Sequence, residues 1–344
     1  MSFIQKLKQD KNRPLFVLAP MADVTDVAFR TVIGEVCSPD IYWTEFVSAD
    51  GLIRATEVGK YKLKKDLLFD AEKQRPIIVQ LFSSTYQNMY EATKLCIELG
   101  FDGVDINMGC PDKSIEKQKC GAGMIKNPDL AVSVIKACKD ARRDFGTEHF
   151  SVSVKTRVGY NDVEIDSWIP LLLEQELDLI TIHARTRKEM SKVPANWEHV
   201  KAVVKMRDEW VEKNPGKTIP LIFGNGDVLD IEDGYKKCLE YNVDGAMIGR
   251  AMFGNPWLFK DIENIKNNFE HKFAPSREER IKILIRQVEV FDQQLGDVKS
   301  FALMKKFFKT YMTGFDDARE VREKIMGMET AGEVMGFLEK SLQV

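Results

Sequence analysis

The sequence has few residues that bind metals or form disulfides. Its 344 residues include six cysteines and four histidines, and no two cysteines form a Cys-x-x-Cys pair. The histidines are scattered, without the short spacings typical of zinc ligands. We therefore expect neither a structural metal site nor a disulfide framework.

Long hydrophobic runs are also missing. No stretch reaches the roughly 20 apolar residues that a membrane-spanning helix needs, and residues 1–8 lack the apolar segment of a secretory signal. With 44% hydrophobic and 30% charged residues, the composition is typical of a globular chain, which we expect to be cytoplasmic and monomeric. The formal net charge of −3 argues against indiscriminate nucleic-acid binding but permits a local basic patch.

Short apolar runs alternate with segments of helical spacing, such as 86–100, which closes on a glycine. Near-continuous hydrophobicity, as in Ile77-Ile78-Val79, is typical of parallel strands covered on both faces. The pattern predicts an α/β fold, a TIM (β/α)₈ barrel. A doubly wound open sheet is the alternative, but no Gly-x-Gly-x-x-Gly follows the first run. The eight runs cover residues 15–19, 41–46, 76–82, 103–109, 150–159, 177–185, 220–227 and 245–251.

The pattern changes after Asn255-Pro256-Trp257. From about Pro275 it is helical, and Ser276 followed by Glu279 indicates a capping box at a helix start. We predict a barrel domain over 1–262, a linker over 267–272 and a C-terminal all-helical domain over 273–344.

The most informative motif is Asn107-Met108-Gly109-Cys110-Pro111, which ends an apolar run with a single thiol between glycine and proline. Glycine permits a sharp turn and proline fixes the following backbone, so the cysteine side chain is aimed by the chain. A small buried cysteine is the alternative interpretation. Other polar residues at predicted strand ends favour a reactive one, because the loops at those ends form the active-site face of such barrels. They are Gln80, Asn107, Lys155, His183, Asn225, Asp227 and Arg250.

Two glycine-bearing loops sharpen the prediction. Gly224-Asn225-Gly226-Asp227 follows the seventh run and Gly249-Arg250 follows the eighth, the usual place of a phosphate site in barrel enzymes. Glycines expose backbone N–H groups there, and Arg250 can bind a phosphate in a bidentate manner. Gly-Asn-Gly-Asp alone could be an ordinary turn. Together, the two loops predict a phosphorylated cofactor.

These motifs follow one another in an order that is typical of one enzyme family. With residues 18–26, Asn107 to Pro111, Gly121-Ala122-Gly123, Lys155-Thr156-Arg157, His183 to Arg187 and the two glycine loops, the chain resembles the tRNA-dihydrouridine synthases over about 15–257. The resemblance implies an FMN-bearing TIM barrel and a helical tRNA-binding domain that together reduce the uracil C5=C6 bond of tRNA with NADPH. By motif, the resemblance implies that Cys110 is the proton donor and that Asn107 and Arg185 bind the substrate. It also implies that FMN is bound by Pro20, Met21, Ala22, Gln80, Lys155, His183, Asn225, Gly226, Asp227, Gly249 and Arg250.

The implied chemistry suits the residues. Hydride transfer from flavin N5 to uracil C6 leaves negative charge at C5 and O4, so an acid must stand on the opposite side of the base. A thiol, with a reference pKa of about 8.5, is mostly protonated at neutral pH and can serve. Lys155 near the N1/O2 edge of the flavin would stabilise negative charge on the reduced ring.

The chain departs from the family pattern in two places. Glu189, Ser191 and Val193 stand where the family commonly has other residues, and this affects the predicted contacts around the target nucleotide rather than the flavin site. Phe307 stands where a histidine is common.

The RNA prediction depends on residues 299–314, which hold four lysines and no acid, interleaved with aromatic residues. This composition predicts Lys305, Lys306 and Lys309 as contacts for tRNA phosphates. The helical spacing of the aromatics indicates packing in the core.

Two other functions are considered. An FMN barrel that acts on a free small molecule, such as a dihydroorotate or dihydropyrimidine dehydrogenase, would leave the helical domain and its lysines unexplained. A non-catalytic tRNA-binding or folding factor would not need Cys110 and Lys155.

Overall fold

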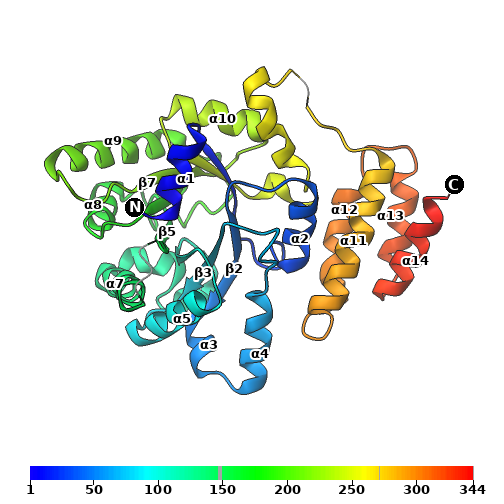
Figure 1. The fold of residues 1–344 in the computed structure, drawn as a ribbon, viewed down its shortest axis with the longest axis horizontal. Coiled ribbons are helices and arrows are strands. Elements are labelled where there is room, and N and C mark those ends of the chain that lie inside the picture. The colour runs from blue at the N-terminus through cyan, green and yellow to red at the C-terminus, as the bar shows by residue number, and fades with distance from the viewer. Residues whose placement is uncertain (146–148, 271, 344) are drawn as a thin grey trace.

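The protein folds as a closed parallel barrel with a helical region beside it (Figure 1). The computed structural model describes residues 1–145, 149–270 and 272–343. Within these ranges, eight parallel strands run in the order β1-β8-β7-β6-β5-β4-β3-β2, and a bridge between Val17 and Ile41 closes the sheet. The predicted TIM barrel is confirmed. Its strands are β1 (Leu15–Leu18), β2 (Tyr42–Ser48), β3 (Ile77–Phe82), β4 (Gly103–Met108), β5 (Ser151–Arg157), β6 (Leu179–His183), β7 (Leu221–Asn225) and β8 (Gly245–Ile248).

The strands are largely hydrophobic because the barrel interior covers one face and helices cover the other. All residues of β3 and β4 are buried. Seven of the strands are slightly shorter than the predicted runs, as in Leu179–His183 for 177–185, whereas β2 extends two residues beyond the predicted 41–46. The residues trimmed at the carboxyl ends, such as Ala184 and Arg185, belong to the loops at the rim where the predicted site residues cluster.

Helices around the barrel begin and end at residues that suit those positions. Asp26 accepts a hydrogen bond from the Phe29 N–H at the start of α2 (Val27–Val36). The predicted helix 86–100 is α5 (Tyr86–Glu98), and Gly100 beyond it has a φ of 84°, which favours glycine. The other elements of this part are α1 (Phe3–Lys11), α3 (Ala49–Arg54), α4 (Glu57–Asp66), α6 (Lys113–Lys117), η1 (Gly121–Lys126), α7 (Pro128–Asp144), α8 (Ile165–Leu173), α9 (Trp197–Lys213) and α10 (Ile231–Glu240).

The chain after β8 is helical, as the sequence predicts. The predicted capping box is present: the Ser276 side chain accepts from the Glu279 N–H, and the Glu279 carboxylate accepts from the Ser276 N–H. The predicted linker follows η3, although His271 lies outside the described residues, and the domain limits at 262 and 273 stay predictions. The elements are η2 (Arg250–Met252), η3 (Leu258–Asn267), α11 (Arg277–Leu295), η4 (Phe301–Met304), α12 (Lys305–Tyr311), α13 (Ala318–Met326) and α14 (Ala331–Ser341).

The helical region packs against the barrel through α2. Phe307 of α12 is buried there, with its ring centroid 5.4 Å from that of Phe29, which gives this departure from the family pattern a packing role. At the rim of this contact, Arg286 of α11 donates to Glu35 of α2 over 2.8 Å. In the described part of the chain, no helix combines the length and hydrophobicity needed to cross a membrane.

Candidate functional site

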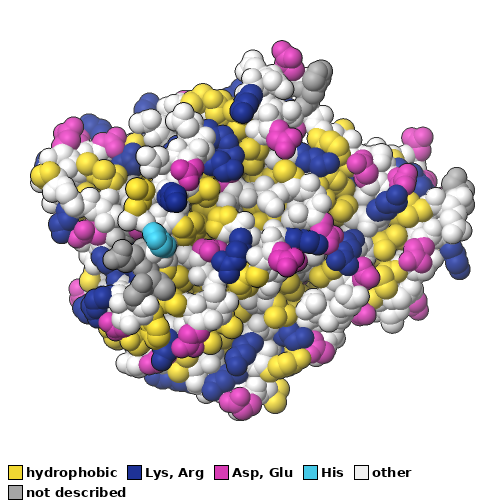
Figure 2. All heavy atoms as spheres, viewed as in Figure 1, with side chains coloured by type: hydrophobic (Ala, Val, Ile, Leu, Met, Phe, Trp, Pro, Cys, Tyr) yellow, Lys and Arg dark blue, Asp and Glu magenta, His cyan; other side chains and the backbone are white. Residues whose placement is uncertain are grey.

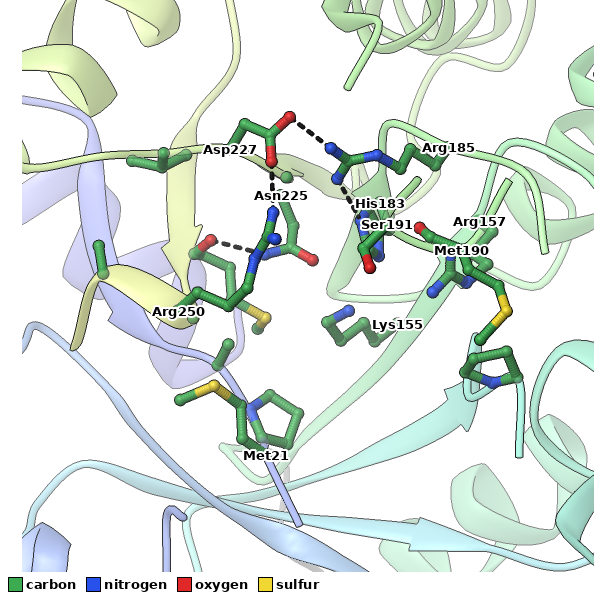
Figure 3. Close-up of a pocket in the computed structure, with 18 of the residues that line it drawn as sticks. Met21, Lys155, Arg157, His183, Arg185, Met190, Ser191, Asn225, Asp227 and Arg250 are labelled. Atoms are coloured by element: carbon green, nitrogen blue, oxygen red, sulfur yellow. Dashed lines mark hydrogen bonds and ion pairs between the residues drawn. The ribbon is translucent and has the colours of Figure 1, made fainter. Parts of the chain in front are cut away.

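A cavity of about 650 Å³ opens at the carboxyl ends of the strands (Figure 3). Side chains from β5, β6 and β7 and from the loops after β1 and β8 converge on it, because parallel strands bring their carboxyl ends to the same rim. Most of the predicted FMN residues lie on its wall. These are Pro20, Met21, Lys155, His183, Asn225, Gly226, Asp227, Gly249 and Arg250, together with the predicted substrate residue Arg185.

The loop after β7 is held in shape by its own residues and by Trp197. Asn225 donates from its side chain to the Met247 carbonyl over 2.8 Å, which ties β7 to β8. Gly226 has a φ of 120°, a conformation that favours glycine, and its carbonyl accepts from the Trp197 indole over 2.9 Å. The loop therefore presents Asp227 at the cavity in a fixed position.

Asp227 lies between two arginines. Its carboxylate accepts from the guanidinium groups of Arg185 and Arg250 (Figure 3). It also accepts from the Ala195 N–H. The Arg185 hydrogen bond is the main reason that the pKa of Asp227 is lowered. Arg185 is buried, whereas the Arg250 side chain is 67% exposed. Arg250 can therefore reach an anion in the cavity.

Positive charge accumulates at the floor of this cavity. Among the described residues, the Lys155 ammonium has no hydrogen-bond partner and lies amid the labelled residues of Figure 3. Burial, with repulsion from Arg157, lowers the pKa of Lys155 to about 8, and burial with neighbouring cations lowers that of His183 well below its usual range. His183 is therefore neutral at pH 7, while Lys155 keeps most of its charge.

A second cavity of about 170 Å³ adjoins the first. It contains the predicted residues Gln80, Asn107 and Cys110, with Phe46 on its wall. Five residues line both cavities, so a ligand in one would face a ligand in the other across a shared boundary. The shared residues are Pro20, Pro111, Lys155, Arg157 and His183.

Cys110 is half-buried on this second cavity. Burial raises the pKa of its thiol, so the group is protonated at neutral pH. Cys120, the competing loop cysteine, is fully buried, and burial raises its thiol pKa to about 12. Cys110 lines the smaller cavity, whereas Cys120 lines neither of the two cavities described above.

The remaining predicted residues lie elsewhere. Ala22 is exposed in the turn after Met21. Lys305, Lys306 and Lys309 are on α12 and line neither of the two cavities. Lys305 pairs with Glu329 at 2.7 Å, half-buried Lys306 is attracted by the barrel acids Asp23, Asp26 and Glu45, and Lys309 is exposed. Their predicted contact with RNA is not tested by these positions.

Several residues of the two cavities were not predicted. Arg157 stands two residues after Lys155 on β5, so strand alternation puts both side chains on one face and could have identified it. Ser191, one of the departures, lines the larger cavity, and Val193 accepts from Arg185 through its carbonyl over 2.6 Å. Glu189 accepts from the Thr186 N–H over 2.7 Å. These departures thus shape the loop that positions Arg185.

The donor set matches an anionic organic ligand rather than a metal. Among the described residues, no group of three His, Cys, Asp or Glu side chains could hold a metal ion, and the backbone N–H groups of Gly249 and Arg250 have no protein acceptor. The fold and the site define a (β/α)₈-barrel protein with a largely basic cavity at the carboxyl ends of its strands.

Comparison with known proteins specifies the class further. The sequence model of the family described as "Dihydrouridine synthase (Dus)" matches residues 17–344, and the chain belongs to this family. The "Probable tRNA-dihydrouridine synthase" of Staphylococcus aureus (strain COL) is 34% identical over 330 residues, which cover 95% of this chain and 93% of that protein. The "Probable tRNA-dihydrouridine synthase 2" of Bacillus subtilis (strain 168) is 36% identical over 329 residues, covering 95% and 94%.

A solved structure of 2-naphthoyl-CoA reductase in complex with 2-naphthoyl-CoA superposes with a TM-score of 0.52 at 11% identity, covering 72% of this chain and 50% of that one. This similarity supports the barrel fold alone.

Proposed function

We propose that this enzyme of the dihydrouridine synthase family reduces uridine in tRNA to 5,6-dihydrouridine, with FMN in the larger cavity and NADPH as the reductant. The observation that carries the proposal is the pair of adjoining cavities: one is lined by several basic side chains and the other contains Cys110. Lys155 and His183 line both.

The larger cavity suits a phosphorylated aromatic cofactor. Its volume is within the range of small-ligand sites. Arg250 would hold the phosphate together with the N–H groups of Gly249 and Arg250, which have no acceptor in the part of the chain that the structure describes. Lys155, a cation without a hydrogen-bond partner among the described residues, would compensate negative charge on the ring system. Asn225 and Gly226 would line the ring plane, since both face the cavity.

The smaller cavity suits the uracil base. Bound FMN supplies the hydride that reaches C6 of the base. Cys110 donates the proton from its sulfur to C5 on the opposite face, and its raised pKa keeps that proton in place until the base is bound. Asn107 fixes the Cys110 backbone N–H at 2.9 Å and so holds the thiol in position.

We propose tRNA as the partner and, with it, a cytoplasmic location. On the face shown in Figure 2, basic and acidic side chains are interspersed over the barrel and the helical region. RNA binding would therefore depend on individual cations rather than on a continuous basic surface. Lys309 is the most accessible of the three predicted phosphate contacts.

The test is a reduction assay with the purified, FMN-loaded protein. We expect NADPH-dependent dihydrouridine in unmodified tRNA and none in free uridine. Activity on free uridine alone would favour a small-molecule reductase. Tight tRNA binding without flavin absorbance or product would favour a non-catalytic factor. A parallel assay with NADH determines the reductant.

A further inference from the structure

A continuous chain of hydrogen bonds links the barrel interior to the Cys110 turn. The Asp105 carboxylate, fully buried on β4, accepts from Gln80 Nε2 of β3 and from Ser153 Oγ of β5, each over 2.6 Å. Gln80 Oε1 then accepts from Asn107 Nδ2 over 2.9 Å. Asn107 Oδ1 accepts from the N–H groups of Gly109 over 3.1 Å and Cys110 over 2.9 Å.

Strand register explains why these side chains meet. Asp105 is paired with Gln80 on one side and Ser153 on the other, so the three side chains share the inner face of the barrel. Asn107 follows two residues later on β4 and faces inward as well. The chain of hydrogen bonds therefore runs from the barrel interior to the rim.

The two ends of this hydrogen-bond chain fix the direction of every bond, because Asp105 accepts at one end and the Gly109 and Cys110 N–H groups donate at the other. An ionised carboxylate can only accept hydrogen bonds, whereas each amide side chain has a donating and an accepting end. Gln80 must turn its NH₂ towards Asp105, which leaves its oxygen for Asn107. Asn107 must then turn its NH₂ towards Gln80, which leaves its oxygen for the turn.

We propose that Asp105 is the positioning residue of the Cys110 turn, because its carboxylate sets the hydrogen-bond direction of Gln80 and Asn107. This inference rests on the proposed function only for its catalytic consequence. If Asp105 could donate, Gln80 could reverse and present its NH₂ to Asn107. Asn107 would then present its own NH₂ to the Cys110 N–H, two donors would face each other, and the turn would lose both bonds.

The test measures hydrogen exchange at the Gly109 and Cys110 amides of the full-length flavoprotein without RNA. Asp105→Asn, which is isosteric but able to donate, should speed exchange at both amides by roughly tenfold. The double variant Asp105→Asn/Gln80→Glu should restore slow exchange, because a carboxylate at position 80 accepts from both amides and the net charge is unchanged. Thr181→Val is the matched control: its buried hydroxyl has no hydrogen-bond partner among the described residues, and exchange should not change.

Gln80→Met interrupts the chain of hydrogen bonds without altering charge, and it should accelerate exchange at both amides as Asp105→Asn does. It therefore tests the proposal even if the variant at position 105 does not fold. Unchanged exchange in the folded single variants, or fast exchange in the double variant, would overturn the proposal. In the tRNA assay, Asp105→Asn should lose up to about 100-fold in uridine reduction, and the double variant should regain part of it. A wild-type protein without activity on tRNA would refute the proposed function and leave the exchange result intact.

Discussion

Lys299, just before η4, donates a hydrogen bond of 2.9 Å to the carboxylate of Glu45 on β2. Both groups are largely withdrawn from water, with side chains 15% and 7% exposed. Asp66 approaches the same ammonium at 2.9 Å. This buried ion pair joins the helical region to the barrel. It lies close to the cavities, since Phe46, the next residue of β2, lines the smaller one.

Replacing Lys299 with Met should destabilise the protein by about 3 kcal/mol, because removing one partner leaves buried acids uncompensated. Urea unfolding measures the change. Lys305→Met is the control: its partner Glu329 is 77% exposed, and the loss should be about 1 kcal/mol or less. Adding Glu45→Gln to Lys299→Met should recover part of the stability. Equal losses in the two single variants would contradict this account.

Glu45 should also make stability depend on pH. Burial raises the pKa of Glu45 from 4.5 to about 7, against the opposing effect of Lys299, so the folded chain holds this proton more tightly than the unfolded chain. The stabilising contribution is complete below the unfolded value and is lost as pH rises towards about 7. Glu45→Gln should therefore gain stability relative to wild type as pH increases through this range. Urea unfolding of both proteins as a function of pH checks the sign.

Arg250→Ala should weaken FMN retention. Loss of a charge-assisted phosphate contact corresponds to about 1.5 to 3 kcal/mol, or roughly 10- to 100-fold in affinity. Flavin absorbance after gel filtration measures the FMN occupancy, and a fluorescence titration then measures the affinity. Arg319→Ala removes an arginine from α13 whose side chain is 82% exposed and should retain FMN normally. Full occupancy in Arg250→Ala would refute the assignment.

Cys110→Ala should bind FMN and tRNA and accept hydride from NADPH, yet lose about 10²- to 10⁴-fold in uridine reduction. Cys120→Ala should remain active, because that thiol is fully buried. Single-turnover oxidation of the reduced protein by tRNA distinguishes them. Normal dihydrouridine yield in Cys110→Ala, with loss in Cys120→Ala, would transfer the proton donor to Cys120.

Replacing Lys305, Lys306 and Lys309 with Ala should weaken tRNA binding and its salt dependence, since fewer counterions are released. The structure refines the expectation: exposed Lys309 should account for most of the effect, because Lys305 is paired and Lys306 is attracted towards the barrel. The log-log slope of affinity against salt is the measurement. Lys324→Ala, from the exposed pair with Glu320, is the control. An unchanged slope in the triple variant would remove these lysines from the interface.

The barrel could be predicted because its strands are buried on both faces and so leave continuous apolar runs, as in β3. The cavity residues could be predicted where they follow a strand, since the topology gathers those positions at one rim. Gly226 and Cys110 belong to this group.

Other features depend on contacts between distant parts of the chain. The 299–314 segment contains no acid, but Asp23, Asp26 and Glu45 of the barrel act on Lys306 across the interface. Asp105 lies inside an apolar run, and its role follows only from strand register with Gln80 and Ser153. Neither arrangement is contained in local sequence patterns.

The packing of α11 on α2 has a consequence for an RNA docked as proposed. α2 begins just after the β1 loop that contributes Pro20 to both cavities, and Arg286 holds α11 to Glu35 at the other end of α2. These contacts hold the helical region at a fixed distance from the opening of the smaller cavity, which contains Cys110. In the folded RNA, the distance between a uridine and the phosphates bound at α12 would then determine which uridine reacts.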